Sequence, residues 1–384
     1  MPASAQTGER VTAVLEDLVR IDSVNPAFGG PTGGEARAAA YIGSFCEGLG
    51  LEVSYHEVLP GRPNVVAKYG AGENHPLLVF EGHLDTVNAG PMSDAFRPSV
   101  DKGRLYGRGA CDAKGGIAAA LAALERLVAI EDLPINLELV GAVDEEVGFQ
   151  GVLAYVANAS QGGAAVVIEP TSLVPVIAHA GVLRGRLRTS GVAAHSSRPE
   201  RGENAIDKLT GSLPGIRGWA SARKPNVHGL TGATSFSVTT IRGGDAINVI
   251  PHECVAEFDW RLHPADDPTR ALVDLTNFLQ ESFPAVEVSD VLLQDRGLET
   301  APDAVIVHAA EEACRRVTGS TGVIGVPWGS DASKFARHGD WHAIVLGPGS
   351  IEQAHTADEW IDIDEVVMAS DLYVEVALQF AEMV

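Results

Sequence analysis

The sequence predicts an α/β protein that is divided into two domains. Three apolar runs, at 77–80, 135–143 and 164–168, have the length and composition of buried strands, and segments with helical spacing lie between them. The 384 residues are more than twice the roughly 150 of an average domain. After Ser172 the strands instead alternate polar and apolar residues, as strands with one wet face do. We therefore expect 1–179 and 296–384 to form one domain, and 180–295 to form a second domain inserted into it.

Composition excludes several classes of protein. Hydrophobic residues make up 45% and charged residues 21%, as in an ordinary globular protein. No apolar run is long enough to cross a membrane, and residues 1–10 lack the pattern of a signal peptide, so we expect a cytoplasmic location and no membrane partner. The four cysteines have no metal-type spacing and are expected to be reduced. A net charge of -23 argues against nucleic acid as a partner.

The first elements of the chain are two amphipathic helices followed by strands. Apolar residues recur at helical spacing on both sides of a Gly- and Pro-rich segment at 25–34. The β-branched and alternating stretches that follow are typical of strands. The expected ranges are helices at 11–20 and 35–49 and strands at 51–55, 64–68 and 77–80.

The third of these strands ends in the first candidate site. It runs into Gly82-His83-Leu84-Asp85, and side chains two residues apart lie on the same face of a strand. A carboxylate beside an imidazole fixes the tautomer and the ring orientation, which is typical of a histidine that binds metal. A solvated polar strand end would show the same pattern, so the assignment depends on the rest of the chain.

A glycine-dense loop at 103–116 precedes an almost wholly apolar helix at 117–129. The loop lacks the Gly-Lys-Ser/Thr ending of a phosphate-binding loop and does not match a dinucleotide fingerprint. We expect its glycines instead to let the backbone turn sharply and present Asp112 beside the start of the helix.

Two further strands end in acids. The strand at 135–143 runs into Asp144-Glu145-Glu146, and the strand at 164–168 ends in Glu169. Adjacent carboxylates repel one another unless positive charge lies among them, although a solvated acidic turn is an equally good explanation of the triplet alone. Sites of open α/β sheets collect at the carboxyl ends of the strands, which is where these residues are predicted to lie.

The inserted block and the return to the first domain complete the chain. The block has alternating strands and two helices, expected at 182–189, 234–242 and 254–262 and at 204–209 and 269–281. The first domain resumes with helices and one strand, expected at 304–317, 342–346 and 363–383, and it carries His355.

The candidates form one set of nitrogen and oxygen donors suited to zinc, cobalt or manganese. They are His83, Asp112, Glu145, Glu146, Glu169 and His355. The set exceeds what one tetrahedral ion can use. A pair of ions needs a bridging carboxylate, ligands on each side, and a carboxylate left to take a proton from water.

These motifs, in this order, resemble the M20 family of dinuclear zinc metallopeptidases and deacylases. The resemblance covers nearly the whole chain through segments 82–85, 107–116, 144–148, 169–171, 191–196, 248–251 and 346–360. It implies a zinc-peptidase-like catalytic domain, with a mixed central sheet flanked by helices. It also implies that the inserted domain is an α+β, ferredoxin-like lid through which two chains form a homodimer.

The resemblance also assigns roles around the metal ions. Two zinc ions are implied, for which cobalt or manganese can substitute, and Glu145 is implied as the general base. The implied ligands are His83 and Glu169 for one ion and Glu146 and His355 for the other, with Asp112 bridging them and Asp85 supporting His83. A cis peptide bond is implied after Asp112.

The remaining expected roles concern the substrate, and they involve residues of the inserted domain and of a loop near the end of the chain. By resemblance, His195 reaches the active site of the partner subunit and stabilises the developing oxyanion. Arg261 and Asn248 match positions that grip the substrate carboxylate, a task that suits a guanidinium. Gly347 and Gly349 are also expected to contribute to substrate binding.

The implied reaction is hydrolysis of the amide of an N-acyl amino acid by a zinc-activated water. Segments 109–112 and 346–359 are most similar to those of acetylornithine deacetylases, so N2-acetylornithine is the first substrate to test. Succinyl-diaminopimelate desuccinylases, dipeptidases and carboxypeptidases, including carboxypeptidase G, are relatives that share the zinc core. A binding protein without catalysis and a metal-buffering protein are alternatives of other classes.

Overall fold

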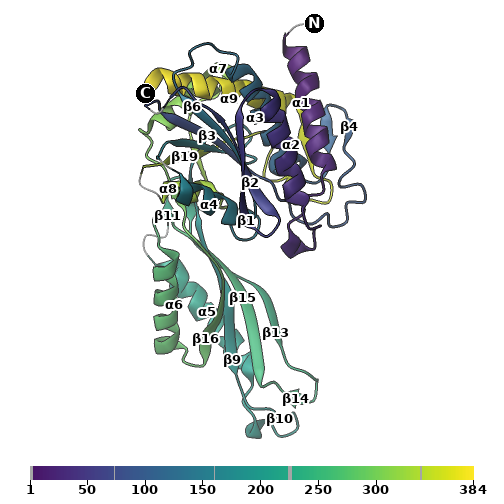
Figure 1. Ribbon diagram of the computed structural model, residues 1–384. Coiled ribbons are helices and arrows are strands. Elements are labelled where there is room, and N and C mark those ends of the chain that lie inside the picture. The colour runs from purple at the N-terminus through teal and green to yellow at the C-terminus, as the bar shows by residue number, and fades with distance from the viewer. Residues whose placement is uncertain (1–2, 73, 160, 224–226, 338–339) are drawn as a thin grey trace. The chain divides into compact units, whose positions relative to one another are not determined.

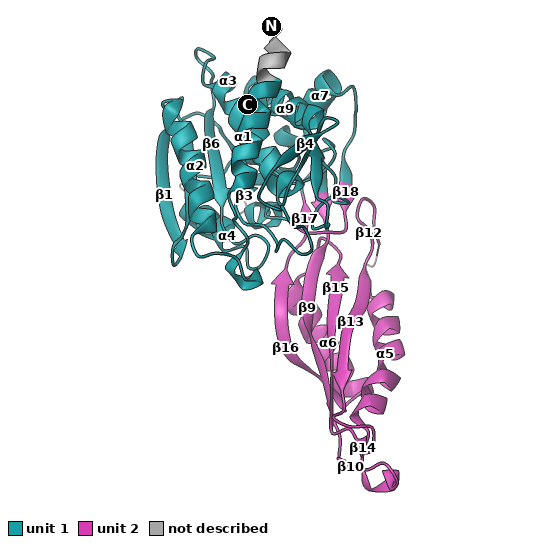
Figure 2. Cartoon of the chain, turned by 90° about the vertical axis from the view of Figure 1, so that its right-hand side faces the viewer, with its two compact units in different colours: residues 1–177, 300–324, 330–384 teal, residues 178–299, 325–329 magenta. Residues whose placement is uncertain are grey.

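The computed structural model describes residues 3–72, 74–159, 161–223, 227–337 and 340–384, with side chains from residue 8 onward. The chain divides into two compact units (Figure 2). Unit 1 comprises residues 1–177, 300–324 and 330–384, and unit 2 comprises residues 178–299 and 325–329.

Unit 1 is built on a mixed sheet in the order β1-β2-β6-β3-β7-β19-β8. Strand β3 is parallel to β6 and β7, and β7 is parallel to β19, whereas β1 and β2 add antiparallel strands at one edge. Four neighbouring strands therefore have their carboxyl ends at the same edge of the sheet. The strands are β1 (Glu52–Leu59), β2 (Arg62–Tyr69), β3 (Leu77–His83), β6 (Asn136–Ala142), β7 (Ala164–Val167), β8 (Val176–His179) and β19 (His342–Val345).

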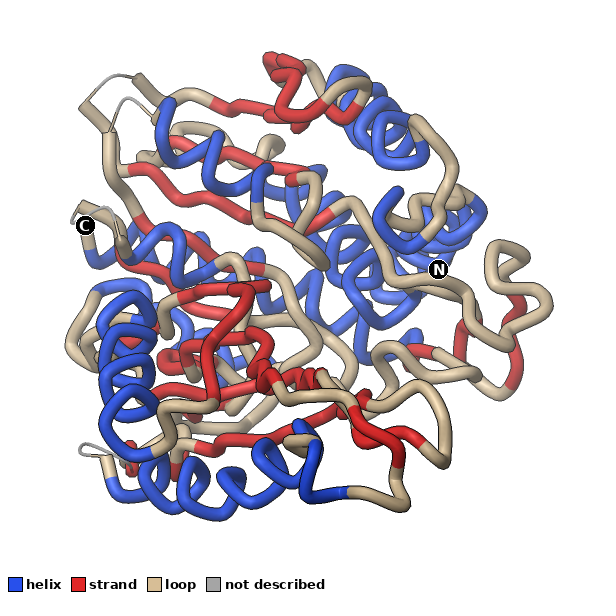
Figure 3. Tube along the Cα trace, turned by 90° about the horizontal axis from the view of Figure 1, so that it is seen from below, coloured by secondary structure: helices blue, strands red, loops and turns tan. Residues whose placement is uncertain are grey.

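Helices flank this sheet, which confirms the predicted fold class (Figures 1 and 3). Helix α3, predicted to be buried from its apolar composition, contacts α1, α2, α9 and β3, and α7 contacts α9 and β19. The short helices α4 and α8 contact each other and pack on β6 and β7. The helices are α1 (Ala3–Arg20), α2 (Gly34–Gly48), α3 (Gly115–Leu127), α4 (Gln150–Asn158), α7 (Val305–Val317), α8 (Ala332–Ala336) and α9 (Ile363–Met383).

Short elements complete the two units. A three-stranded sheet in unit 1 contains β4 (Ser99–Asp101), β5 (Arg104–Tyr106) and β20 (Trp360–Asp362). Single helical turns lie at Pro26–Phe28 and Pro199–Arg201, and the segment Ala110–Lys114 is interrupted by non-helical dihedral angles at Asp112 and Ala113. The remaining short strands are β11 (Val227–His228), β12 (Gly232–Ala233), β17 (Leu298–Glu299) and β18 (Ile324–Val326).

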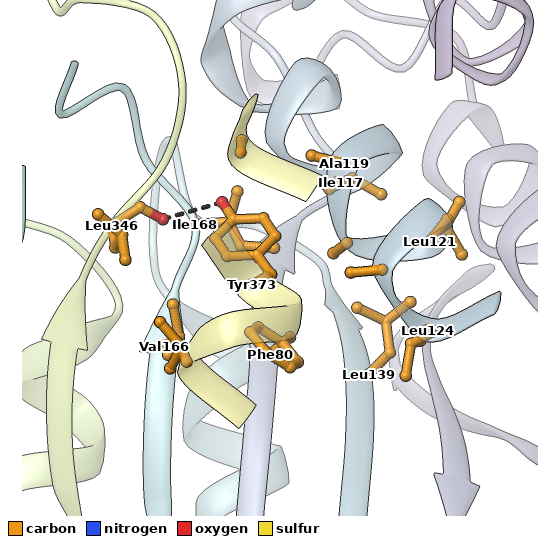
Figure 4. Packing of buried hydrophobic residues seen from close by; sticks show 14 of the residues in the cluster. Phe80, Ile117, Ala119, Leu121, Leu124, Leu139, Val166, Ile168, Leu346 and Tyr373 are labelled. Carbon is orange, nitrogen blue, oxygen red and sulfur yellow. Dashed lines mark hydrogen bonds between the residues drawn. The ribbon is translucent and has the colours of Figure 1, made fainter. Parts of the chain in front are cut away.

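The core of unit 1 ties the sheet to the segment that follows β19 (Figure 4). Phe80 of β3 packs against Tyr373 of α9 with 5.3 Å between the ring centroids. The hydroxyl of Tyr373, which is fully buried, donates a hydrogen bond to the carbonyl oxygen of Leu346 at 3.0 Å (Figure 4). Because the chain runs from Leu346 toward His355, this bond helps to fix the start of that segment.

Replacing Tyr373 with Phe is expected to lower the free energy of unfolding by about 1 kcal/mol, because the buried carbonyl of Leu346 loses its donor. Urea denaturation measures the change. Tyr41→Phe is the matched control, because its hydroxyl donates to Asp17 at an exposed position. The control is expected to stay within about 0.5 kcal/mol of the wild type. Equal effects in the two variants would contradict the role of the buried bond.

Unit 2 is a four-stranded antiparallel sheet in the order β13-β15-β9-β16, covered by two helices. Along β15 buried and half-buried residues alternate, and Trp260 faces the helices. The other face carries cross-strand ion pairs such as Arg184 with Asp259 and Arg186 with Glu257. Bounds are β9 (Gly181–Ser190), β10 (Ala194–His195), β13 (Ser235–Gly243), β14 (Val249–Ile250), β15 (Glu253–Leu262), β16 (Val286–Asp295), α5 (Ala205–Ala222) and α6 (Pro268–Ser282).

Strand β16 was not among the expected elements. It lies at an edge of the sheet, and its pairing with β9 is interrupted twice by register shifts. Most of its residues are exposed, so its sequence does not alternate regularly between polar and apolar residues. This irregularity explains why the hydrophobic pattern did not predict the strand.

Within the described part of the chain, no helix combines the length and the apolar character that crossing a membrane requires.

Candidate metal centre

The predicted metal ligands come together at the carboxyl edge of the parallel strands. His83 is the last residue of β3, Glu146 lies in the turn after β6, and Glu169 follows β7. Asp112 precedes α3, and His355 lies in the segment after β19. Their ligand atoms form two groups, each within 4.8 Å: His83, Asp112 and Glu169, and Asp112, Glu146 and His355.

Asp112 is the residue that both groups share. Its Oδ1 lies 2.9 Å from Nε2 of His83, and its Oδ2 lies 3.3 Å from Nε2 of His355. The same nitrogen of His355 lies 3.1 Å from Oε1 of Glu146. One carboxylate thus directs its two oxygens at two different histidines, as a ligand shared by two ions does. The Asp112–Ala113 peptide bond is cis, as implied by the resemblance.

The electrostatics of the groups favour a cation. Burial raises the pKa of Glu169 well above its usual value, and the charge of Asp112 raises it further. Burial also raises the pKa of Glu146, although the hydrogen bond with His355 lowers it. For His355 itself, hydrogen bonds with Asp112 and Glu146 raise the pKa to about 10. Carboxylates concentrated in a poorly solvated site attract positive charge, and a nitrogen and oxygen donor set of this kind fits a divalent transition metal.

His83 is oriented for a ligand at its Nε2. Its Nδ1 lies 2.9 Å from the main-chain carbonyl oxygen of Asp85, so Nδ1 carries the proton and donates it. The carboxylate of Asp85 is farther away, with Oδ1 3.6 Å from Nδ1. Support for the imidazole therefore comes chiefly from the main chain of Asp85, whereas the sequence predicts support from its side chain.

The carboxylate of Asp85 instead holds the turn that carries Glu145 and Glu146. It accepts hydrogen bonds from the main-chain N–H groups of these two residues, at 3.1 and 3.2 Å, and from Nδ2 of Asn25 at 2.7 Å. Burial alone would raise the pKa of Asp85, but the nearby imidazole of His83 and the hydrogen bond from Asn25 outweigh it and lower the pKa. Asp85 is therefore an ionised anchor for this turn.

Glu145 extends from the same turn into the carboxylate cluster. Burial raises its pKa well above the usual value, His83 lowers it, and the charges of Asp331 and Glu146 raise it again. Its side chain belongs to neither of the two groups of ligand atoms. Glu145 is thus a carboxyl group of the cluster that is in neither group of candidate ligands.

Glu359 holds the backbone that leads into Asp112. Its carboxylate accepts hydrogen bonds from the guanidinium of Arg108 at 2.5 Å and from the N–H groups of Gly109, Cys111 and Asp112 at 3.0, 2.9 and 3.1 Å. Arg108 also donates to the carbonyl oxygen of Thr356, next to His355. The pair therefore links the segment of the shared ligand to the segment of His355. Sequence comparison placed both residues in matched segments without giving either a role.

The two predicted substrate-binding glycines have their backbone groups engaged within the protein. The N–H of Gly347 donates to Thr171 Oγ1, and its carbonyl accepts from the N–H of Leu173. Gly349 has φ +81, and a Cβ there would lie 2.5 Å from Sγ of Cys111. These contacts give Gly347 a packing role beside Glu169 and Gly349 one beside Cys111.

In unit 2, His195 is exposed and its tautomer is defined. Its Nδ1 accepts hydrogen bonds from the N–H and the hydroxyl of Ser197, at 3.1 and 2.8 Å. The proton must then reside on Nε2, which is available as a hydrogen-bond donor. Asn248 lies on the adjoining segment, where its carbonyl oxygen accepts from the N–H of Ser196 at 2.9 Å.

Arg261 lies at the other end of the sheet of unit 2. It lies eight positions along β15 from Glu253, which is next to the segment of Asn248, and this corresponds to about 26 Å of extended strand. Its Nε donates to Asp259 at 2.7 Å. Arg261 and Asn248 of one chain therefore cannot grip the same carboxylate.

Sequence reasoning missed Asn25, Glu35 and Arg62, which form a buried network behind the turn with Glu145 and Glu146. Arg62 belongs to no motif, and its contacts join strand β2 to distant parts of the chain. No local pattern in the sequence could have identified it.

Comparison with known proteins agrees with this geometry. The model of peptidase family M20/M25/M40 matches residues 79–379. An acetylornithine deacetylase of Myxococcus xanthus is 35% identical over 317 residues, covering 80% of this chain and 81% of the relative.

Two solved structures show the same fold. An M20 family metallo-carboxypeptidase from Sulfolobus solfataricus superposes with a TM-score of 0.82 at 20% identity and covers 100% of both chains. The aminopeptidase PepT from Bacillus cereus superposes with a TM-score of 0.78 at 21% identity, covering 97% of this chain and 99% of its own. Together with the sequence matches, these findings show that the chain belongs to peptidase family M20/M25/M40 and is a metal-dependent amidohydrolase or peptidase.

Proposed function

We propose that the protein hydrolyses the amide bond of an N-acyl amino acid, with N2-acetylornithine as the first substrate to test. The observation that carries the proposal is the position of Asp112, whose two oxygens face His83 and His355. The similarity to an acetylornithine deacetylase supports the choice of substrate.

The proposed ligands divide between two zinc ions. His83 and Glu169 would hold the first ion, Glu146 and His355 would hold the second, and Asp112 would be a ligand common to both. Cobalt or manganese can replace zinc in such a donor set. When bound, the ions polarise the amide carbonyl and make water a stronger acid.

Glu145 is the proposed general base. It accepts a proton as water attacks the amide carbonyl and passes that proton to the nitrogen of the leaving amine. Its raised pKa favours proton uptake, and the hydrogen bond from its own N–H to Asp85 holds its backbone in place. One carboxyl group can therefore serve both proton transfers.

Unit 2 is the proposed lid and dimerisation domain. Its His195 presents an Nε2 donor that suits a developing oxyanion. Because Arg261 and Asn248 of one chain lie too far apart for one carboxylate, we propose that they act on a substrate from different copies, with His195 and Asn248 supplied by a second copy. This arrangement requires a homodimer.

A substrate panel tests the proposal. The purified protein is assayed with N2-acetylornithine, N-succinyl-diaminopimelate, dipeptides and C-terminally cleaved peptides, each with zinc, cobalt and manganese. Fastest turnover of N2-acetylornithine is the expected result. A preference for the succinyl compound or for peptides would assign the protein to another activity of the same family.

Chelation distinguishes a metal-dependent enzyme from a binding protein and from a metal-buffering protein. Removing metal is expected to abolish turnover, and adding zinc or cobalt back is expected to restore it. A protein that binds acyl amino acids without cleaving them would be a binding protein. One that takes up metal but shows no effect of any acyl amino acid would be a metal-buffering protein.

A further inference from the structure

A closed network of buried polar side chains lies behind the turn that carries Glu145 and Glu146. Its members are Asn25, Glu35, Arg62, Asp85 and Asp144. The exposed fraction is 2% for Glu35, 0% for Asp85 and 5% for Asp144, and 12% for the side chain of Arg62. Three carboxylates thus share a poorly solvated space, where each needs a donor or a positive charge.

Arg62 supplies that charge from the start of β2. Its Nη2 lies 3.0 Å from Oε1 of Glu35 and 2.9 Å from Oδ1 of Asp144, and its Nε also donates to Glu35. Glu35 Oε1 in addition accepts from the main-chain N–H of Asp144 at 3.0 Å. Asp144 is therefore held by both its side chain and its backbone.

Asn25 closes the network on the side of Asp85. Its Oδ1 accepts from the N–H of Ala27, which orients the amide so that Nδ2 faces the carboxylates. That nitrogen donates to Asp85 at 2.7 Å and to Asp144 at 3.1 Å. The carboxylate of Asp85 in turn accepts from the N–H groups of Glu145 and Glu146.

The turn needs this external support. Asp144 has φ 72, a left-handed conformation that non-glycine residues rarely adopt. Inside the turn its carbonyl oxygen accepts from the N–H groups of Gly148 and Phe149. The contacts of Arg62 and Glu35 fix the residue at which the turn begins, and Asp85 fixes the two residues that follow.

We propose that Arg62 is a positioning residue, which acts through Glu35, Asp144 and Asp85 to set the places of Glu145 and Glu146. The inference rests on the proposed function, because it gives these two carboxylates the roles of base and metal ligand. Arg62 touches neither substrate nor metal. A guanidinium is needed here because one planar group must bind two carboxylates in fixed directions, which the single ammonium of a lysine cannot do.

The two groups of ligands make the inference testable. Glu146 belongs to the second group and the first group takes no ligand from the turn. Displacing the turn should therefore weaken the binding of the ion in the second group and leave the binding of the other ion nearly unchanged. Loss of a residue that orients a ligand typically lowers metal affinity by about 10–100-fold.

Arg62→Lys is the variant that tests this role, with calorimetric titration of the metal-free protein with cobalt. We expect affinity for one ion to fall about 10–100-fold and affinity for the other to change by less than about 3-fold. We also expect kcat on the best substrate to fall while KM stays near the wild-type value. A merely structural arginine would lower the melting temperature and leave the ratio of the two affinities unchanged, and that result would overturn the inference.

Arg126→Lys is the matched control. Arg126 pairs with Asp371 at 2.5 Å between α3 and α9, with side chains 41% and 48% exposed. The same change there is expected to leave both affinities and kcat unaltered. Glu35→Gln is measured in parallel and is expected to produce the same selective loss. If Arg62→Lys and Glu35→Gln, or the one of them that folds, bind both ions with wild-type affinity, the inference is wrong.

Amide hydrogen exchange separates this inference from the proposed function. In the metal-free protein, peptides that cover residues 144–149 should exchange faster in Arg62→Lys than in the wild type or the control. This readout requires neither turnover nor bound metal. A wild-type protein that cleaves no acyl amino acid would refute the proposed function alone, whereas unchanged exchange in the turn would refute the role of Arg62.

Discussion

Replacing Glu145 with Gln is expected to reduce kcat by roughly 10²–10⁴-fold while both metal ions remain bound. The amide has nearly the same shape as the carboxylate but cannot accept the proton from water. The main-chain bond from residue 145 to Asp85 does not depend on the side chain and should persist. Removing a half-buried carboxylate of raised pKa is also expected to leave the melting temperature unchanged or higher.

Steady-state kinetics and metal analysis of the same preparation measure both parts of this result. Glu131→Gln, at an exposed position between α3 and β6, is the control and should retain full activity. Wild-type turnover in Glu145→Gln would rule out Glu145 as the base. Lost activity together with lost metal would instead make Glu145 a ligand.

Asp112→Ala is expected to remove both ions, because the carboxylate belongs to both groups of ligand atoms. Each group keeps two donors, and the loss of affinity should exceed the roughly 10–100-fold caused by losing an orienting residue. Activity should then be absent at zinc concentrations that saturate the wild type.

Glu169→Ala is the informative comparison, because Glu169 belongs to one group alone. Metal analysis after gel filtration is expected to find close to one ion per chain in Glu169→Ala and close to none in Asp112→Ala. Equal metal content in the two variants would contradict the shared position of Asp112.

The sequence predicted those features that depend on local pattern. Apolar runs that end in polar residues located β3, β6 and β7, and the carboxyl ends of parallel strands meet at one edge, so His83, Glu146 and Glu169 could be expected near one another. His355 was harder to place, because it lies in a loop. The sequence offered it as a metal-binding candidate, and the resemblance to a family assigned it to the second ion.

What the sequence could not predict depends on contacts between distant segments. Arg62 and Glu35 lie far from Asp144 in the sequence, and the pairing of β2 with β6 and the packing of α2 on β2 bring the three together. Asp85 was expected to support His83 with its carboxylate, but this carboxylate accepts hydrogen bonds from the N–H groups of the turn after β6. Packing and hydrogen-bond geometry determine such contacts, and the spacing of residues in the sequence does not predict them.

The order of the ligands along the chain gives the two ions different effects on folding. The ligands His83, Asp112 and Glu169 all precede unit 2, whereas His355 follows it. An ion held by Glu146 and His355 would therefore cross-link the two ends of a loop that contains the whole of unit 2. Closing so long a loop restricts the unfolded chain, while the other ion closes a shorter one. The second ion would thus cross-link the C-terminal part of unit 1 to its N-terminal part.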